Sequence, residues 1–322
     1  MSDRSHCLHP RTKKCGLTKA GTQRHKCLEC GKRFTASTKT LDGMRIDLDK
    51  AAQVLNMLCE GMSVEATSRL TDTHKHTILD LLVNVGYRCQ RFLFKAIRGV
   101  SVEDVQCDEI WQFIYCKNKN VDRATASGFE GACGDSWTFT AVERHTKLVL
   151  AWHFGRRHGA DAMVFCHKLR QATKGHFHLS TDGYNAYLSA VPMYFAGQID
   201  YGQLVKKFGK SSFEDQRQYS PARIIGCDRE VVMGTPDEDR ICTSHVERHN
   251  GSIRNFTKRT CRLTYCFSKR WTNHEAQLGL YFAHYNFCRK HRSLKGQTPA
   301  MAHGLATEVW SVRELLNRIS EH

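Results

Sequence analysis

Three carboxylates in the sequence stand where metal-dependent chemistry at phosphorus would need them. Asp108 lies in the middle of an otherwise apolar segment, where a charge is costly unless it pairs or binds a cation. Asp182 ends a second expected strand, at the sheet edge where α/β proteins place their chemistry. Glu247 begins an expected helix. Several carboxylates that hold Mg²⁺ (or Mn²⁺) would stabilise the attacking and leaving oxygens of an in-line displacement at phosphorus.

The two aspartates also have simpler interpretations. Asp182 and Gly183 form a common turn pair, and Asp108 could pair with one of many arginines. Glu109 should point to the opposite face of the strand from Asp108, because side chains alternate along a strand. We therefore expect only one of these two neighbours to serve a shared site.

Glu247 has a competing interpretation of its own. Ser244 and Glu247 have the spacing of a helix capping box. That motif does not explain Arg254 and Lys258, which would return to nearly the same face of the helix and could grip a phosphodiester. We assign the cap to Ser244 and the metal to Glu247, and expect Glu247 to face Asp108 and Asp182.

The elements that must position these residues form an α/β pattern. Segments 105–115, 137–142 and 147–155 are rich in apolar and β-branched residues and are expected to be strands. A helix is expected over 161–172, and 177–191 should be a strand that turns into a helix at Asp182. This order predicts a mixed sheet with flanking helices, compatible with a ribonuclease-H-like layout.

The net charge of +16 is unevenly distributed. Residues 1–46 carry eleven Lys and Arg against three acids, and residues 248–295 carry eleven against one. Concentrated basic charge indicates a polyanion partner, and nucleic acid is favoured over a membrane. No run of about 18 apolar residues and no secretory signal is present, so an intracellular location is expected.

A cysteine pair near the N-terminus indicates a structural zinc site. Cys27 and Cys30 have the spacing of a zinc knuckle. Cys7 and Cys15 are the favoured partners, with His9 as the substitute ligand, although their spacing is irregular. A Cys-x-x-Cys pair without metal is the alternative. We expect a small zinc ribbon, because so basic a segment needs a metal to fold.

Three helices are expected over 47–87. A first helix stops at Gly61, Ser63 begins a short second helix, and a third carries Ile78, Leu81 and Val85 on one face. This arrangement is typical of a helix-turn-helix that places its last helix in the major groove. The solvent-facing candidates for reading DNA are His74, Lys75, Thr77 and Asp80.

Several blocks of the chain together resemble the DDE transposases, and most of all their insertion-sequence-one (IS-one) family. The N-terminal block GTQRHKCLECGKRF and the helices after it are similar to the N-terminal half of that family. The other blocks are QCDEIWQF, STDGYNAYLSAV, YSPARIIG, ICTSHVERHNGSIRNFTKR, LTYCFSKRWTNHEA and HYNFCRKHRSLKGQTPAMAHGL. The departure is at the zinc ribbon, where the family usually has a cleaner first knuckle.

The resemblance implies a ribonuclease-H-like core that cuts transposon ends and joins them to target DNA with Mg²⁺. It implies Asp108, Asp182 and Glu247 as catalytic metal ligands, with Arg254 seven residues after the Glu. Terminal inverted repeats, target DNA and a homodimer or larger oligomer are the expected partners. The location would be cytoplasmic and nucleoid-associated in a bacterium, and nuclear in a eukaryote.

Lys75, Thr77, Arg254 and Lys258 are the expected DNA contacts. Two further side chains, His249 and Asn250, are expected near the leaving strand. The alternatives are a domesticated, non-cleaving DNA-binding protein and a nuclease without strand transfer. The expected domains are a zinc ribbon (1–46), a helix-turn-helix domain (47–99), the catalytic domain (100–305) and a helical tail (306–322).

Overall fold

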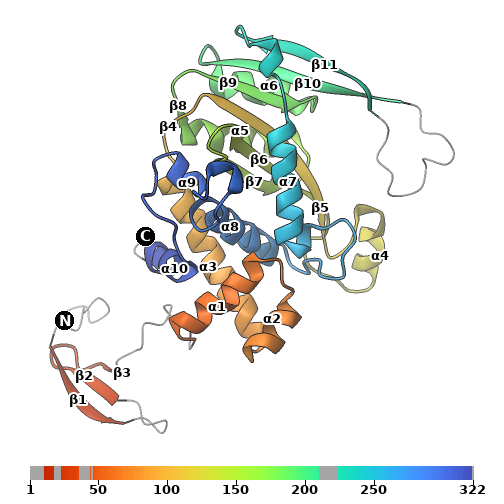
Figure 1. Cartoon of the computed structure of the whole chain (residues 1–322). Coiled ribbons are helices and arrows are strands. Elements are labelled where there is room, and N and C mark those ends of the chain that lie inside the picture. The colour runs from red at the N-terminus through yellow and green to blue at the C-terminus, as the bar shows by residue number, and fades with distance from the viewer. Residues whose placement is uncertain (1–10, 18–22, 36–43, 45, 210–223, 321–322) are drawn as a thin grey trace. The chain divides into compact units, whose positions relative to one another are not determined.

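The computed structural model of the chain describes residues 11–17, 23–35, 44, 46–209 and 224–320 (Figure 1). It divides into two compact units, residues 1–51 and 52–322. The division falls inside helix α1 (Leu48–Cys59). Within the described ranges, no helix combines the length and apolarity that crossing a membrane requires.

The first unit contains a three-stranded antiparallel sheet. Its strands are β1 (Thr12–Leu17), β2 (Gln23–Cys27) and β3 (Arg33–Thr35), in that order. The turn between β2 and β3 carries Cys27 and Cys30, and the amide of Gly31 donates to the carbonyl of Cys27 at 3.1 Å. Gly31 has a φ of +74°, which glycine adopts without strain. This turn has the tight form that a zinc knuckle needs.

The second unit is built on a six-stranded mixed sheet. Strand β5 (Asp104–Ile114) lies at its centre, between β9 (Phe177–Asp182), which is parallel to it, and β6 (Gly134–Glu143), which is antiparallel. Beyond β6 lies β7 (Val149–Gly155), and beyond β9 lie β10 (Ile199–Phe208) and β11 (Ile224–Met233).

Helices cover both faces of this sheet. On one face, α5 (Gly159–Ala172) and α6 (Ala186–Phe195) pack on Phe139 of β6 through Phe165 and Tyr187. The other face is covered by α7 (Ser244–Phe256), next to β5, and α8 (Trp271–Phe287), whose Phe282 packs on Trp152 of β7. Glu109 faces the first layer and Asp108 the second.

A further helical layer lies behind α8. Helix α3 (Lys75–Ala96) packs along α8, and the two backbones meet closely at Gly86 and Gly279. Helix α2 (Val64–Thr71) begins at Ser63, whose hydroxyl accepts from the Ala66 amide at 3.1 Å. Helix α10 (Val312–Ser320) contacts α3 and α8. The short elements are β4 (Val100–Ser101), β8 (Thr173–Lys174), α4 (Val121–Ala126), α9 (Pro299–Ala302) and the 3₁₀ turns η2 (Asn118–Asn120), η3 (Glu238–Arg240), η4 (Lys258–Thr260) and η5 (Arg292–Leu294).

The structure confirms the mixed α/β class, and every strand and helix predicted between 105 and 191 is present. The three helices predicted over 47–87 are also present, although α3 continues to Ala96. The stretch between Asp182 and Glu247 adds β10 and β11 to the sheet edge. The predicted domain boundaries remain predictions.

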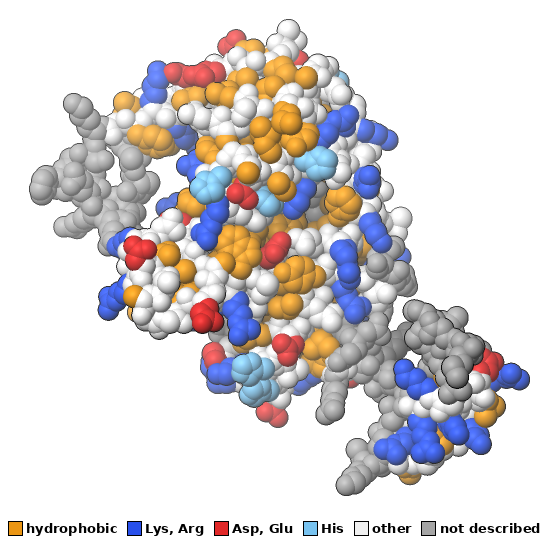
Figure 2. Space-filling model, turned by 180° about the vertical axis from the view of Figure 1, so that it is seen from behind, with side chains coloured by type: hydrophobic (Ala, Val, Ile, Leu, Met, Phe, Trp, Pro, Cys, Tyr) orange, Lys and Arg blue, Asp and Glu red, His pale blue; other side chains and the backbone are white. Residues whose placement is uncertain are grey.

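The face of the second unit that is turned away in Figure 1 has few charges in its upper part. Figure 2 shows hydrophobic side chains gathered there, where Figure 1 places α5 and α6. Three exposed hydrophobic residues of these helices are Val164, Leu188 and Met193. The Lys and Arg side chains in this view lie mainly lower down and along one flank.

Candidate metal centre

The pairing of β5 and β9 brings Asp108 and Asp182 together. Cys107 lies opposite Thr181 in the parallel register, so the next residue of each strand is an aspartate. Asp108, Glu109 and Asp182 each offer a carboxylate oxygen, and these oxygens lie within 4.8 Å of one another. Carboxylates this close, half-buried at a strand end, could hold a metal ion.

Both Asp108 and Glu109 lie close to Asp182, although alternation was expected to bring only one of them to a shared site, and Glu109 is paired with Arg157. The two side chains do leave β5 on opposite faces, as the alternation rule requires. Strand β9 ends at Asp182, however, so its backbone no longer separates the two faces beyond that point. Asp182 therefore lies within reach of both neighbours.

Burial and mutual repulsion raise the pKa values of these carboxyls. Burial, then the charges of Asp182 and Glu109, raises the pKa of Asp108 to about 8. Burial, then Asp182, raises the pKa of Glu109 to about 7, against the opposing effect of Arg157. Burial also raises the pKa of Asp182. Such a cluster is unfavourable when ionised and is stabilised by a cation.

Two basic residues that the sequence analysis did not single out lie at this cluster. The Nε of Arg157 donates to Glu109 Oε1 at 2.8 Å, and its guanidinium stacks on the Tyr184 ring at 4.4 Å. The Nζ of Lys206, on β10, lies 2.5 Å from Glu247 Oε1. Arg157 follows the end of β7 and Lys206 lies on an outer strand, so neither stands in a motif that predicts its position.

Glu247 is held by neighbours and does not belong to the carboxylate group within 4.8 Å. The hydroxyl of Thr243 donates to its Oε1 at 2.5 Å, and Lys206 binds the same oxygen. Its charge nevertheless contributes to the raised pKa of both Asp108 and Asp182, so it lies near them. The side chain of Glu247 bonds to Thr243 and Lys206, and its role as a metal ligand that faces the aspartates stays a prediction.

The predicted capping box at Ser244 does not form. The helix begins at Ser244, and its N-cap residue Thr243 makes no side-chain capping bond. The amides of His245 and Val246 in the first turn donate to Gln106 Oε1 of β5. Thr243 and Glu247 instead bond through their side chains, one turn apart. The predicted cap is therefore wrong by one residue and in its hydrogen-bond pattern.

The two residues expected near the leaving strand have different surroundings. Asn250 donates its Nδ2 to Asp108 Oδ2 at 2.8 Å and so orients that carboxylate. His249 is only 3% exposed and packs on Tyr285 and Phe282 of α8, which places it in the core and not at a DNA strand. Burial lowers the pKa of His249 to about 3, so it is neutral.

Arg254 and Lys258 do not share a helix face. Helix α7 ends at Phe256, and Lys258 begins the separate turn η4 with its side chain exposed. Arg254 donates to the carbonyls of Thr260 at 2.8 Å and Trp111 at 3.3 Å. Burial lowers the pKa of Arg254 to about 10, which leaves it charged at neutral pH. Its role as a phosphate ligand stays a prediction, and two of its donors already fix the end of α7.

The predicted zinc ligands are only partly within the described residues. Cys7 and His9 lie outside them. Cys15 lies on β1, while Cys27 and Cys30 lie at the turn after β2, and the described residues include no group of three that joins them within 4.8 Å. The zinc site remains a prediction.

The helix-turn-helix candidates lie at the start of α3. His74, Lys75 and Asp80 are exposed and Thr77 is half-buried. Lys75 Nζ lies 3.7 Å from Glu65 of α2, and His74 caps the helix by accepting from the His76 amide. These positions are accessible, as DNA contacts must be.

The fold and site together define a mixed α/β protein with a carboxylate cluster on two adjacent parallel strands. No family model and no curated protein matches the chain. Its function therefore has to be inferred from the site.

Proposed function

We propose that the chain is a DDE-type DNA transposase with a ribonuclease-H-like core, which cleaves transposon ends and joins them to target DNA. The observation that carries this proposal is the cluster of Asp108, Glu109 and Asp182 within 4.8 Å at the centre of a mixed sheet. Three antiparallel strands, a helix, a parallel strand, a helix and a further parallel strand are compatible with such a core. The resemblance of the motifs around the acids supports the same assignment.

The donor set fits a hard divalent cation. All its ligand atoms are carboxylate oxygens, which favour Mg²⁺ or Mn²⁺ over softer metals. Asp108 and Asp182 would be the primary ligands, and Glu247 would be the third ligand in place of its present bond to Lys206. When bound, the ion would lower the pKa of an attacking water and stabilise charge on the phosphate oxygens.

The chain's own residues prepare this site. Asn250 holds one oxygen of Asp108, which leaves its carboxylate in a defined orientation. Arg157 neutralises Glu109, which reduces the repulsion among the acids. Lys206 neutralises Glu247. When Lys206 is released from Glu247, its ammonium becomes available to a DNA phosphate.

DNA binding rests on the basic segments. The zinc ribbon over 1–46 would hold Zn²⁺ on Cys7, Cys15, Cys27 and Cys30, with His9 as the alternative ligand. This ribbon and the exposed start of α3, with Lys75 and Thr77, would bind the terminal inverted repeats. Arg254 and Lys258 would lie beside the cut strand. Two ends must be joined, so a homodimer or larger oligomer acts.

The test is a joining assay with paired terminal-repeat DNA, Mg²⁺ and a target plasmid. The wild-type protein should join ends, and Asp108→Asn and Asp182→Asn should bind them without cutting. Asp122→Asn, an exposed acid on α4, is the matched control and should join normally. Binding without cleavage by the wild type would refute the proposal in favour of a regulator, and nicking without joining would favour a nuclease.

A further inference from the structure

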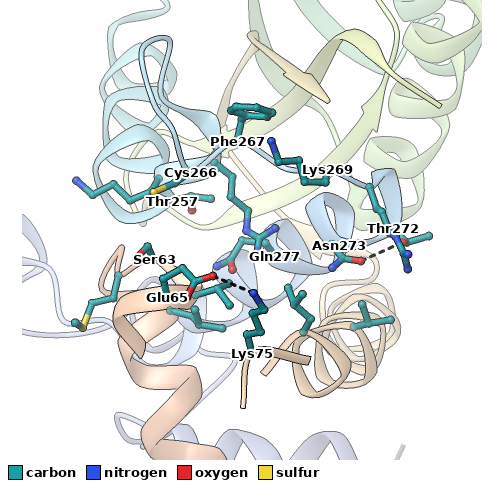
Figure 3. Close-up of a pocket in the computed structure, with 18 of the residues that line it drawn as sticks. Ser63, Glu65, Lys75, Thr257, Cys266, Phe267, Lys269, Thr272, Asn273 and Gln277 are labelled. Carbon is teal, nitrogen blue, oxygen red and sulfur yellow. Dashed lines mark hydrogen bonds and ion pairs between the residues drawn. The ribbon is translucent and has the colours of Figure 1, made fainter. Parts of the chain in front are cut away.

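A large groove in the second unit lies apart from the carboxylate cluster. It has a volume of about 980 Å³. Helices α2 and α3 form one side, the segment 257–270 after α7 forms the other, and α8 closes the back. Figure 3 shows Glu65 and Lys75 on the first side, Cys266, Phe267 and Lys269 on the second, and Gln277 between them.

Most of the charged residues that line the groove are cations. Its acidic residues are Glu65 and Asp80, and Glu65 is paired with Lys75. Lys269 and Arg270 on the opposite side are exposed, as is Lys258. The lining cations are Lys75, Lys258, Arg259, Lys269 and Arg270. This excess indicates an anionic ligand that extends along the groove.

Three buried polar groups of the lining residues lack a partner. Thr257 Oγ1, Asn84 Oδ1 and Gln277 Nε2 form no hydrogen bond with any described residue. Buried polar atoms are normally hydrogen-bonded, and leaving one unpaired costs about 1–3 kcal/mol. These three atoms have almost no accessible surface, so the case for a ligand rests on the cations and the aromatic rings of the groove.

Aromatic side chains stand at the mouth of the groove. Tyr265 is fully exposed, at 101% of its reference area, although tyrosine usually buries part of its ring. Phe267 carries the Lys269 ammonium over its face at 3.4 Å. An exposed ring beside a cationic groove is the combination by which proteins bind single-stranded nucleic acid: bases stack on rings while cations follow the backbone.

The groove is connected to the carboxylate cluster through β5. The amide of Tyr115, next to the end of β5, donates to the Ser268 carbonyl at 2.8 Å, which fixes the segment that carries Tyr265 and Phe267. Six residues separate Asp108 from Ile114, or about 20 Å of strand. That distance corresponds to a few nucleotides of an extended DNA strand.

We propose that this groove binds unpaired nucleotides of the DNA strand near the cleavage point, with Tyr265 as the stacking platform and Lys269 on the backbone. The inference rests on the proposed function for the identity of the strand. It adds a second binding site that is distinct from the acids and adjoins the predicted major-groove contacts at the start of α3, with which it shares Lys75. A strand held here would keep the end of the duplex open while the acids act on it.

The experiment measures fluorescence anisotropy of the full-length protein in chelator, with a labelled duplex bearing an oligothymidine tail and with the same duplex blunt. Tyr265→Ala should weaken binding of the tailed duplex by about 5- to 150-fold, the usual effect of losing one stacked base. Binding of the blunt duplex should change little. Tyr265→Phe keeps the ring and should bind like the wild type, and Leu263→Ala, an exposed residue of the same segment, is the matched control.

Lys269→Gln tests the backbone contact. It should reduce the slope of log affinity against log salt for the tailed duplex by about 0.7, the value for one single-strand phosphate. Lys174→Gln, an exposed lysine on β8, should leave the slope unchanged.

The outcomes separate this inference from the proposed function. Equal affinities of the wild type and Tyr265→Ala for the tailed duplex would overturn the groove assignment, and so would equal losses for tailed and blunt DNA. Asp108→Asn should retain full tail binding while it loses cleavage. If the wild type never cleaves but Tyr265→Ala still loses the tail, the groove stands and the transposase assignment fails.

Discussion

Replacing Asp108 with Asn should stabilise the metal-free protein while it removes metal binding. The pKa of Asp108 is raised from 3.8 to about 8, so keeping it ionised opposes folding by a ceiling of about 6 kcal/mol. Asn cannot accept both from Asn250 and from the Glu109 amide as the carboxylate does, which costs about 1 kcal/mol. Asp182 and Glu109 would also change their own degree of ionisation once the Asp108 charge is removed. We therefore expect a net gain of about 2–3 kcal/mol, which for a chain of this size is a Tm rise of roughly 3–5 °C.

The raised pKa of Asp108 determines how the stability gain depends on pH. A carboxyl whose folded pKa is raised destabilises the protein progressively as pH rises from its unfolded pKa, near 4, to its folded pKa, about 8. The stability difference between Asp108→Asn and wild type should be largest above pH 8 and shrink as the pH approaches about 5. Taking the difference cancels the other titrating groups that both proteins share.

The assay is thermal unfolding by circular dichroism, in chelator and with Mg²⁺ or Mn²⁺. Metal should raise the Tm of the wild type and not that of Asp108→Asn, because only the wild type keeps the full carboxylate set. Asp122→Asn should behave like wild type throughout. The reasoning would be refuted if Asp108→Asn were less stable than wild type in chelator above pH 8, or if metal stabilised both equally.

Three further predictions test the packing and charges around the site. Gly86→Ala should lower the free energy of unfolding in chemical denaturation by about 1–3 kcal/mol, because the added Cβ would lie 2.2 Å from the Ala276 carbonyl oxygen of α8. The control Gly251→Ala, at an exposed helical glycine, should raise it by about 0.5–1 kcal/mol. Equal effects of the two substitutions would contradict the close crossing of α3 and α8. Lys206→Met should raise the Mn²⁺ affinity measured by calorimetry by about 5- to 30-fold, because it removes an ammonium whose competition for Glu247 costs the metal about 1–2 kcal/mol of binding free energy. An unchanged or weaker affinity would count against Glu247 as a ligand. Burial lowers the pKa of His249 to about 3, so the stability that neutral His249 contributes above pH 6.5 is lost as the pH falls. His249→Phe should therefore move the midpoint of acid unfolding to lower pH. An unchanged midpoint would argue against a neutral histidine in the core.

The central strands could be predicted because their signal is local. The segment from Val105 to Ile114 is rich in β-branched and aromatic residues that need burial, and the central position of β5 in the sheet supplies it. Strands β10 and β11 were harder to place, since β10 carries lysines at its exposed end and β11 is mostly exposed. Strand β10 pairs with β9 across the intervening helix α6, and β11 joins the sheet only through β10. The positions of β10 and β11 are therefore determined by the assembled sheet and not by the local sequence.

The site shows the same division between local and non-local information. Asp182 at a strand end was a local inference, and its contact with Asp108 follows from a parallel register that no sequence pattern encodes. The exclusion of Glu109 used side-chain alternation correctly but ignored that β9 stops at Asp182. Arg157, just after β7, and Lys206, on β10, reach the cluster from separate parts of the chain, so their contribution depends on tertiary structure alone.

Glu247 shows how the capping and metal interpretations are linked. Its Oε1 accepts from Thr243 and binds Lys206, so the first turn of α7 is held by the side chain that the metal would require. A divalent cation competes with the Lys206 ammonium for Glu247 most strongly where further carboxylates also attract it. Asp108 and Asp182 are near enough to Lys206 to supply that attraction. Exchange of Lys206 for a metal would then free an ammonium beside the scissile phosphate. Metal and DNA binding should therefore reinforce one another, and Lys206→Met should weaken DNA binding in Mg²⁺ even as it strengthens metal binding without DNA.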